Sequence, residues 1–294
     1  MMDLMGIYIK ALENYLNWFW NDQLLVSTNN LFGNYFWGLA FISITFFILE
    51  VILPWRKKQT VFRKYFWQDA FYMYFNLFLF YIVLFAGLSA VAEFCSLWIL
   101  KIVGFENEVL FYIEDLPTWS QLLIVFIVTD FTHWNIHRML HKYSFLWRFH
   151  RLHHSIKEMG FAGHLRFHWM ESIIYKSITY FPLLVIGFET EYLFYMYMIS
   201  ISWGHFNHAN IIIPMGVLKY VFNSPQMHIW HHVKELPKGR ELGFNFGLTL
   251  SIWDYIFKTN YEPYSGRDIE IGFEGDEHYP KTFVKQIYNG FRKE

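Results

Sequence analysis

Histidine at helical spacing is the feature of this sequence most able to do chemistry. Thirteen of its fourteen histidines fall in five clusters, whose members lie mostly three or four residues apart. Residues at that separation share one side of an α-helix, so each cluster can direct its imidazoles at one point. This number of imidazoles exceeds the four ligands of one tetrahedral site, which predicts two metal ions close together. The clusters are His133, His137 and His141; His150, His153 and His154; His164 and His168; His205 and His208; and His228, His231 and His232.

The spacing His-x-x-His-His occurs twice, at His150–His154 and at His228–His232. Adjacent residues diverge by about 100° around a helix, so a His-His pair can straddle two metals while the first histidine binds one of them. A repeat of this spacing is far more specific than one His-x-x-x-His, which a wet helix end explains equally well. We therefore expect these two segments to be central to a metal site, and His278, alone in a polar stretch, to be solvated.

Two carboxylates accompany the histidines. Asp130 lies on nearly the same helix face as His137, and Glu171 follows His168 by three residues. A ligating histidine usually donates its second ring proton to a carboxylate, which makes both residues candidates for orienting a ligand. His205 stands with His208 at the end of an apolar segment, where an ionisable group is costly and suggests a function.

The elements that must position these residues are long apolar segments. The chain has 294 residues, of which 54% are hydrophobic, 22% aromatic and only 17% charged. This composition predicts an all-α, multi-pass transmembrane protein. The last two segments form a short hairpin, which returns its two ends, near His168 and His205, to the same membrane face. The five predicted spans are Tyr35–Leu53, Asp69–Ala90, Trp119–Ile136, Ser172–Gly187 and Glu191–Ser202.

Charge predicts the orientation of these spans. Lysine and arginine dominate the segments after the first and third spans and the C-terminal region, while glutamate and aspartate dominate the opposite loops. By the positive-inside rule, the basic segments and every histidine cluster lie on the cytoplasmic side. No face for nucleic acid is visible. The single cysteine, Cys95, excludes a disulfide framework and an iron–sulfur site within this sequence.

Four regions follow from these patterns. The aromatic cluster around Trp18 predicts an interfacial N-terminal segment, 1–34, before the first transmembrane helices, 35–117. Within the latter, Val91–Pro117 is a re-entrant helix, a surface helix or a further span. The catalytic region is 118–259, and 260–294 is a surface tail.

The histidine boxes resemble those of the fatty acid hydroxylase superfamily, which includes the sterol desaturases and the C-4 methylsterol oxidases. The resemblance covers roughly Trp119–Thr259 and leaves out the first two spans and the tail. The segments that carry it are Asp130 with His137–His141, His150–Ser155, Arg166–His168 ahead of Glu171, His208–Asn210, Pro225–His232, Asn245–Gly247 and Trp253–Phe257.

The resemblance implies a membrane-embedded non-haem di-iron oxygenase with a cytoplasmic metal site and a lipid substrate, in a bacterial inner membrane or the endoplasmic reticulum. Two iron ions are the implied cofactor, with zinc possible in isolated protein. Candidate catalytic residues are Asp130, Glu171 and Asn210, and His133 stands beside the ligands rather than among them. His168, which matches the sterol-oxidase branch, and His205 are kept as further candidate ligands. The implied ligands are His137, His141, His150, His153, His154, His208, His228, His231 and His232.

The chemistry of such an enzyme limits its partners. Oxidation of an unactivated C–H bond needs a redox-active metal, because acid and base side chains cannot supply it. The sequence has no dinucleotide-binding fingerprint, haem-attachment motif or set of cluster-binding cysteines. Electrons are therefore expected from a separate donor of the cytochrome b5, ferredoxin or flavoprotein type. A sterol, a fatty acyl chain, an ether lipid, a carotenoid and an aminolipid all stay open as substrate, as do hydroxylation and desaturation.

Three other classes of protein fit the histidines less well. A zinc-stabilised scaffold would have the same ligands and no oxygen chemistry. A metal transporter would need histidines through the depth of the spans rather than gathered at one face. A bis-histidine cytochrome usually uses single histidines inside facing spans. We rank these below the oxygenase, in that order.

Overall fold

The computed structural model describes residues 4–24, 34–79, 113–188 and 191–292, together with Ala90, Phe94, Trp98 and Ile102. Within these residues the fold is helical, with isolated β-bridges and no strand, which confirms the all-α prediction. The longer helices are α1 (Leu4–Trp18), α2 (Tyr35–Ile52), α3 (Phe66–Tyr74, continued by the π-turn Phe75–Leu79), α5 (Thr118–Lys142), α7 (Trp169–Ile186) and α8 (Glu191–His208).

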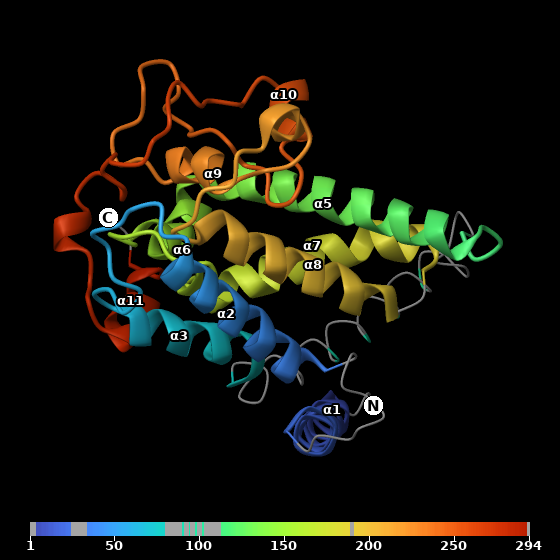
Figure 1. The fold of residues 1–294 in the computed structure, drawn as a ribbon. Helices are drawn as coiled ribbons and strands as arrows, with labels where there is room; N and C mark the ends of the chain where they lie inside the picture. The colour runs from blue at the N-terminus through green and yellow to red at the C-terminus, as the bar shows by residue number, and fades with distance from the viewer. Residues whose placement is uncertain are drawn as a thin grey trace.

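Helices α5, α7 and α8 form the body of the molecule and run along its length, with α2 and α3 on one side of them (Figure 1). Shorter helices gather where α5 and α8 end, and we call this end the cap. Its elements are α6 (Ser144–His154), the 3-10 turn η5 (Phe161–Gly163), the 3-10 turn η6 (Gly216–Tyr220), α9 (Pro225–His231), α10 (Ile252–Ile256), the 3-10 turn η7 (Asp276–His278) and α11 (Phe283–Asn289).

Local sequence explains how the chain turns into the cap. Tyr143 adopts an extended conformation between α5 and α6, so the chain breaks there and α6 starts a new direction. Helix α9 begins at Ser224, whose side chain accepts the Met227 N–H, and Pro225 follows in the first turn, where its missing N–H has no cost. These two breaks bring the two His-x-x-His-His segments to the same end of the molecule.

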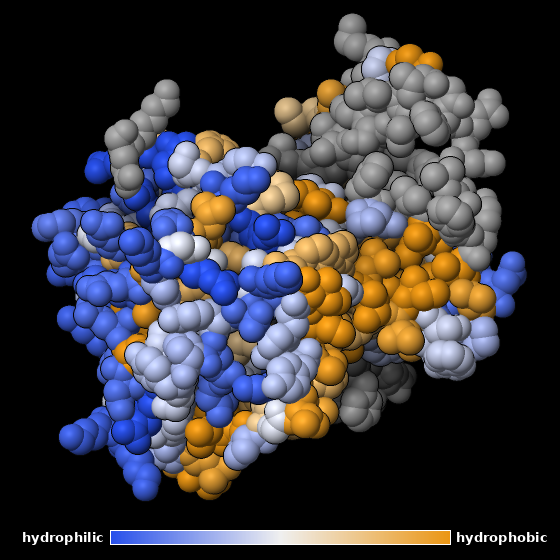
Figure 2. Space-filling view, turned by 90° about the horizontal axis from the view of Figure 1, so that it is seen from above, coloured by the Kyte–Doolittle hydropathy of each residue, from blue (hydrophilic) through white to orange (hydrophobic). Residues whose placement is uncertain are grey.

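On the face seen in Figure 2, the surface divides into a hydrophilic end and a hydrophobic area beside it. The hydrophilic half is the end that carries the cap. On α2, Trp37, Phe41, Ile44 and Ile48 share one face and are 40–73% exposed. Helix α5 likewise exposes Trp119, Leu123 and Ile127. Apolar faces of this size are typical of contact with lipid.

Four of the five predicted spans coincide with the helices α2, α5, α7 and α8, and the fifth, Asp69–Ala90, continues beyond Leu79 into residues outside the described ranges. Among the described helices, α2 alone is long and apolar enough to qualify as a span by its own composition. The others contain polar residues that face inward, such as Thr129 and Lys176, which lower their hydropathy. Helix α1 has no buried residue and is seen end-on in Figure 1, across the direction of the long helices.

The segment predicted as a surface tail is part of the cap. The Gly272 N–H donates to the His232 carbonyl at 2.9 Å, and the Ile287 carbonyl lies 2.9 Å from His168 Nε2. The Tyr72 hydroxyl donates to Gln286 Oε1 at 2.9 Å. Phe273, Tyr279, Phe283 and Ile287 also pack in one apolar cluster with Tyr72 and Leu152. These apolar residues are scattered along the segment rather than gathered in one run, so hydropathy gave no sign of the packing.

Glu50 joins the end of α2 to the cap. Its side chain is buried, and its Oε1 accepts the N–H groups of Phe161 and Asn210, each at 2.8 Å. Asn210 continues the junction, because its Oδ1 accepts the Arg56 N–H at 2.8 Å. One carboxylate thus serves two buried backbone donors from distant segments.

Replacing Glu50 with alanine should destabilise the protein by roughly 2–4 kcal/mol, because both N–H groups lose their acceptor. Thermal unfolding in detergent measures this as a fall of several degrees in the melting temperature. Glu50→Gln keeps the accepting oxygen and should lose less. The control is Glu158→Ala, at an exposed glutamate. Equal melting temperatures for Glu50→Ala and this control would contradict the role given to Glu50.

Candidate metal centre

Nine histidines converge in the cap as two adjacent groups. Within each group, one ring nitrogen from every histidine lies within 4.8 Å of all the others. These nine are the residues that the sequence resemblance implies as ligands. The first group is His137, His141, His150, His154 and His231, and the second is His153, His208, His228 and His232.

The adjacent histidines of each His-His pair belong to different groups. His153 and His154 separate in this way on α6, and His231 and His232 separate at the end of α9. The rings of His154 and His232 nevertheless lie 4.4 Å apart between centroids, so the groups adjoin. This is the arrangement that a divergence of about 100° per residue predicts.

Backbone carbonyls and one carboxylate fix the ring orientations in the first group. The Nδ1 atoms of His137 and His231 lie 2.8 Å from the carbonyl oxygens of Phe246 and Phe244. His150 Nδ1 lies 2.7 Å from Glu171 Oε2. Because a carbonyl only accepts, Nδ1 must carry the proton of a neutral ring, and Nε2 is then a bare lone pair.

These bare nitrogens face one another. His137 Nε2 and His150 Nε2 are 3.2 Å apart, and neither holds a proton to share when Glu171 is ionised. In the second group, His208 donates from Nδ1 to the Gly204 carbonyl at 2.8 Å, while its Nε2 lies 3.2 Å from His153 Nε2. Facing lone pairs repel unless a cation lies between them. The donor set therefore fits metal ions that favour imidazole, such as iron or zinc.

Buried nitrogens without a hydrogen bond point the same way. The Nε2 atoms of His141, His154 and His231 make no hydrogen bond within the described structure. A buried acceptor left unpaired has a cost in free energy, which a metal–ligand bond removes. Each of these atoms belongs to the first group, where the ring nitrogens converge.

Burial keeps the cap histidines neutral. Loss of hydration lowers the pKa of His150, His153 and His154 well below the usual histidine value, and neighbouring imidazoles lower it further. The same causes lower the pKa of His231 and His232 on the other segment. Neutral imidazole is the form that binds metal, so the ligands need lose no proton when a metal enters.

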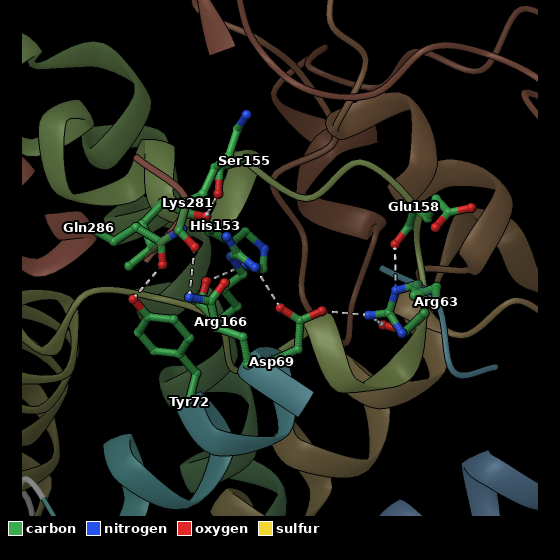
Figure 3. A network of polar contacts seen from close by, with 12 residues as sticks. Arg63, Asp69, Tyr72, His153, Ser155, Glu158, Arg166, Lys281 and Gln286 are labelled. Atoms are coloured by element: carbon green, nitrogen blue, oxygen red, sulfur yellow. Dashed lines mark hydrogen bonds and ion pairs between the residues drawn. The ribbon is translucent and has the colours of Figure 1, made fainter. Parts of the chain in front are cut away.

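A buried ion network supports the second group (Figure 3). Asp69 on α3 lies between Arg63, at 2.9 Å, and Arg166, at 2.7 Å. The Arg166 carbonyl in turn lies 3.3 Å from His153 Nδ1. Arg63 extends the network to the Glu158 carbonyl at 2.8 Å. The position of a histidine in the second group thus depends on a carboxylate outside the histidine boxes.

Asp254 performs a similar task for the first group. Its buried carboxylate accepts the N–H groups of Phe246 and Gly247, at 2.9 and 2.8 Å, and the Trp134 indole N–H at 3.1 Å. Burial raises the pKa of Asp254, and these hydrogen bonds oppose the rise. Asn245, which directly precedes Phe246, has a φ of 56°, a left-handed conformation that asparagine tolerates. By holding the backbone of Phe246 and Gly247, Asp254 directs the Phe246 carbonyl toward His137.

Besides Glu171, four predicted site residues lie outside the two groups. His168 has both ring nitrogens engaged by backbone, at the Ile287 carbonyl and the Met170 N–H. His205 contacts Ser43 Oγ at 3.2 Å and His164 Nδ1 at 3.1 Å. Asn210 holds the backbone of Arg56.

The fourth, Asp130, accepts the Trp253 indole N–H at 2.9 Å and orients no histidine. It shares a face with His137 but precedes it by seven residues, about 10.5 Å along the helix, which is too far for a hydrogen bond. The carboxylate that orients a histidine is Glu171. Its Oε2 contacts the ring of His150, from another helix, whereas its Oε1 accepts the backbone N–H of the neighbouring His168 at 3.3 Å.

A cavity of about 520 Å³ leads from the metal centre into the body of the molecule. Its walls come from α1, α2, α5, α7 and α8 and are mainly apolar and aromatic, with His133 and His164 among them. The volume lies in the range of small-molecule sites. His137, His150, His153, His208 and His228 reach the cavity from the two groups.

Residues 122–259 match the family model described as fatty acid hydroxylase. They form a fatty acid hydroxylase domain. This finding confirms the resemblance carried by the histidine boxes. The matched range includes all nine grouped histidines, as well as Glu171 and Asp254, but it excludes Glu50, Asp69 and the C-terminal part of the cap.

Relatives of the fatty acid hydroxylase domain have names that describe lipid oxidation. The ornithine lipid hydroxylase OlsE of Rhizobium tropici is 28% identical over 62% of this chain and 54% of its own length. Human alkylglycerol monooxygenase is 31% identical over 52% of this chain and 33% of its own. Methylsterol monooxygenase 1-3 of Arabidopsis thaliana is 27% identical over 48% of each. The chain thus spans about half of these relatives or less. No solved structure matches it significantly.

The split of the two groups predicts separate metal losses. His231→Ala should remove the metal of the first group, and His232→Ala that of the second, so each variant should retain about half of the wild-type metal. Elemental mass spectrometry of protein purified in detergent measures metal per chain. His278→Ala is the matched control, because this exposed histidine lies outside both groups. Full metal content in both variants would exclude the proposed ligand sets.

Glu171 should control the affinity of the first group. Glu171→Leu removes the acceptor of His150 Nδ1–H and should weaken metal binding by roughly 10–100-fold. Glu171→Gln retains an oxygen acceptor without the charge and should fall between the leucine variant and the wild type. Competition with a chelator measures the metal affinity of each protein. Equal affinities for the wild type and both variants would contradict this role of Glu171.

Proposed function

We propose that this protein is a multi-pass membrane oxygenase that uses two iron ions and O₂ to hydroxylate or desaturate a lipid. The observation that carries the proposal is the pair of bare imidazole groups at the end of a largely apolar cavity. The names of the relatives, which include hydroxylases and monooxygenases of lipids, support the reaction class.

Each part of the chain has a task in this proposal. The nine grouped histidines hold the metals, and paired iron would supply the oxidation of an unactivated C–H bond by O₂. Glu171 holds His150 in its ligating tautomer. Asp254 does the same for His137 indirectly, because it holds the backbone of Phe246, whose carbonyl contacts His137 Nδ1. Apolar cavity residues such as Leu165, Phe167 and Leu248 exclude water and align the substrate.

The bilayer is the natural environment for such a substrate. The exposed apolar faces of α2 and α5 support several membrane-spanning helices, with the cap outside the hydrocarbon. Basic residues of the cap region, among them Arg63 and Arg166, favour a cytoplasmic cap in a bacterial inner membrane or the endoplasmic reticulum. Reducing electrons come from a separate protein of the cytochrome b5, ferredoxin or flavoprotein type.

Lipid extracts from cells that produce the protein test this function. Under ¹⁸O₂, wild type and His278→Ala should yield a lipid that carries one labelled oxygen atom, or one with two fewer hydrogen atoms. His231→Ala and His232→Ala should yield neither product. An unchanged lipid profile from iron-loaded wild type supplied with each donor type would refute the oxygenase and favour a metal-binding scaffold.

A further inference from the structure

One wall of the cavity carries a stripe of uncharged polar side chains, which oxidation of a hydrocarbon does not require. Its members follow one another at helical spacing on α5 and on α7, and all of them line the cavity. Helices α5 and α7 pack against each other, and the rings of His133 and Tyr175 meet edge to face with centroids 5.2 Å apart. We call this set the polar stripe, which consists of Thr129, His133, Ser172, Tyr175 and Thr179.

Polar atoms of the stripe have no hydrogen-bond partner within the described part of the chain. The hydroxyl oxygens of Thr129 and Thr179 are buried and unpaired, and the two residues are only 5% and 7% exposed. Around the side chains of His133 and Tyr175, the described residues provide a ring contact but no hydrogen bond. Buried polar groups in proteins are nearly always paired, so a set of unpaired ones around a cavity indicates that a ligand supplies the partners.

The two charged side chains among the described lining residues, Glu171 and Lys176, already have partners. Glu171 Oε2 lies 2.7 Å from His150 Nδ1, and the ammonium of Lys176 lies over the ring of Tyr197, 5.8 Å from its centroid. In the polar stripe, a hydroxyl can both donate and accept, whereas the bare nitrogen of a neutral His133 can only accept. The stripe therefore suits a ligand group that carries no charge and has a hydrogen to donate.

We propose that the polar stripe binds an uncharged hydrogen-bonding group of the substrate, which is a hydroxyl or an amide with an N–H. The cavity then selects lipids that donate a hydrogen bond from such a group over lipids that can only accept one, such as ethers and tertiary amides. This inference rests on the proposed function and adds the substrate class to it. Polar groups at this depth between apolar helices are costly, and they usually mark a functional site.

The position of the polar stripe also restricts where oxidation occurs. His133 precedes the grouped histidine His137 by four residues, about 6 Å along α5, and Tyr175 follows Glu171 by the same distance along α7. A group held between His133 and Tyr175 is therefore about one helical turn from the metal centre. The oxidised carbon should lie near this group rather than at the distant end of a long chain.

Equilibrium binding to the whole chain in nanodiscs tests the inference. The probes are two pairs whose members differ in one donor hydrogen: hexadecanol and its methyl ether, and N-methylpalmitamide and N,N-dimethylpalmitamide. Affinities are expressed as mole fractions in the bilayer, so that unequal partitioning into lipid has no effect. Wild type should bind the donor of at least one pair roughly 5–100-fold more tightly, the cost of an unpaired buried group. A preference confined to one pair identifies the group as hydroxyl or amide, and equal affinities within both pairs overturn the proposal.

Variants assign the preference to the polar stripe. His133→Phe and Tyr175→Phe keep an aromatic ring and remove its polar atoms, so each should lower the preference for the donor while the methyl ether binds as it does to wild type. Tyr288→Phe is the control, because this exposed tyrosine lies outside the cavity wall. A preference that both stripe variants retain in full overturns the proposal.

The melting temperature of the protein without added lipid probe distinguishes a binding role from a structural one. Thr179→Val replaces a hydroxyl that has no partner, so the melting temperature should stay the same or rise. Thr259→Val is the matched contrast, because the Thr259 hydroxyl donates to Asp254 Oδ1 at 2.6 Å, and its loss should lower the melting temperature. An equal fall in both variants would show that the Thr179 hydroxyl holds the fold and would overturn its place in the binding site.

The outcomes separate this inference from the proposed function. Binding needs no turnover, so a preference that depends on His133 and Tyr175 in a protein that oxidises no lipid refutes the oxygenase alone. Oxidation of a lipid without a hydroxyl or amide N–H, at a rate that His133→Phe and Tyr175→Phe leave unchanged, refutes the substrate class alone.

Discussion

The structure depends on keeping the Nδ1 proton of several ligating histidines on the side away from their neighbours. Where carbonyl oxygens of Phe244, Phe246 and Gly204 receive that proton, the Nε2 lone pairs have no choice but to face inward. The cost is mutual repulsion in a dry interior, and a cation removes it. These backbone carbonyls therefore have one task in common, which is to accept the Nδ1–H hydrogen bond of a ligating histidine.

That requirement explains why charges lie so deep in a molecule with an apolar exterior. Glu50 and Asp69 each serve two partners, and Asp254 serves several, so each of these buried carboxylates joins segments that are distant in the chain. Each one fixes a turn or loop against a long helix. Helices alone could not do so, because their own backbone groups are already paired and leave nothing to hold a loop. These buried hydrogen bonds and ion pairs thus hold the irregular segments in place, so that each ligating histidine ring keeps its orientation.

The ligands could be predicted from sequence because their pattern is local. Helical spacing places His150 with His154, and the divergence of adjacent residues separates His153 from His154, without any knowledge of the fold. The partners of the rings are not local, and they were predicted poorly. Asp130 shares a helix face with His137 and is still too distant, whereas Glu171 reaches His150 from another helix. Every residue has a backbone carbonyl, so residue type cannot show which carbonyl accepts a hydrogen bond from a histidine ring.

Hydropathy likewise revealed the helices but not the packing of the C-terminal segment, whose attachment to the cap combines scattered apolar contacts with hydrogen bonds such as that of Gln286 with Tyr72. A scattered apolar residue looks the same in a sequence whether it is exposed or packed, so composition cannot distinguish a surface tail from this part of the cap. Residues chosen for one precise contact are the hardest to recognise in a single sequence.

The range shared with the fatty acid hydroxylase family ends at residue 259, yet the parts that steady the metal centre do not. Glu50, Asp69 and the segment around Gly272 and Gln286 all lie outside it and hold histidine-bearing segments in place. The range matched by the family model is thus smaller than the set of segments that hold the metal centre in place. A chimaera that moved residues 122–259 onto another set of helices would carry every ligand and still need new supports for the loops between them. Substitutions in those flanking segments can therefore change the geometry of the metal centre without replacing any ligand.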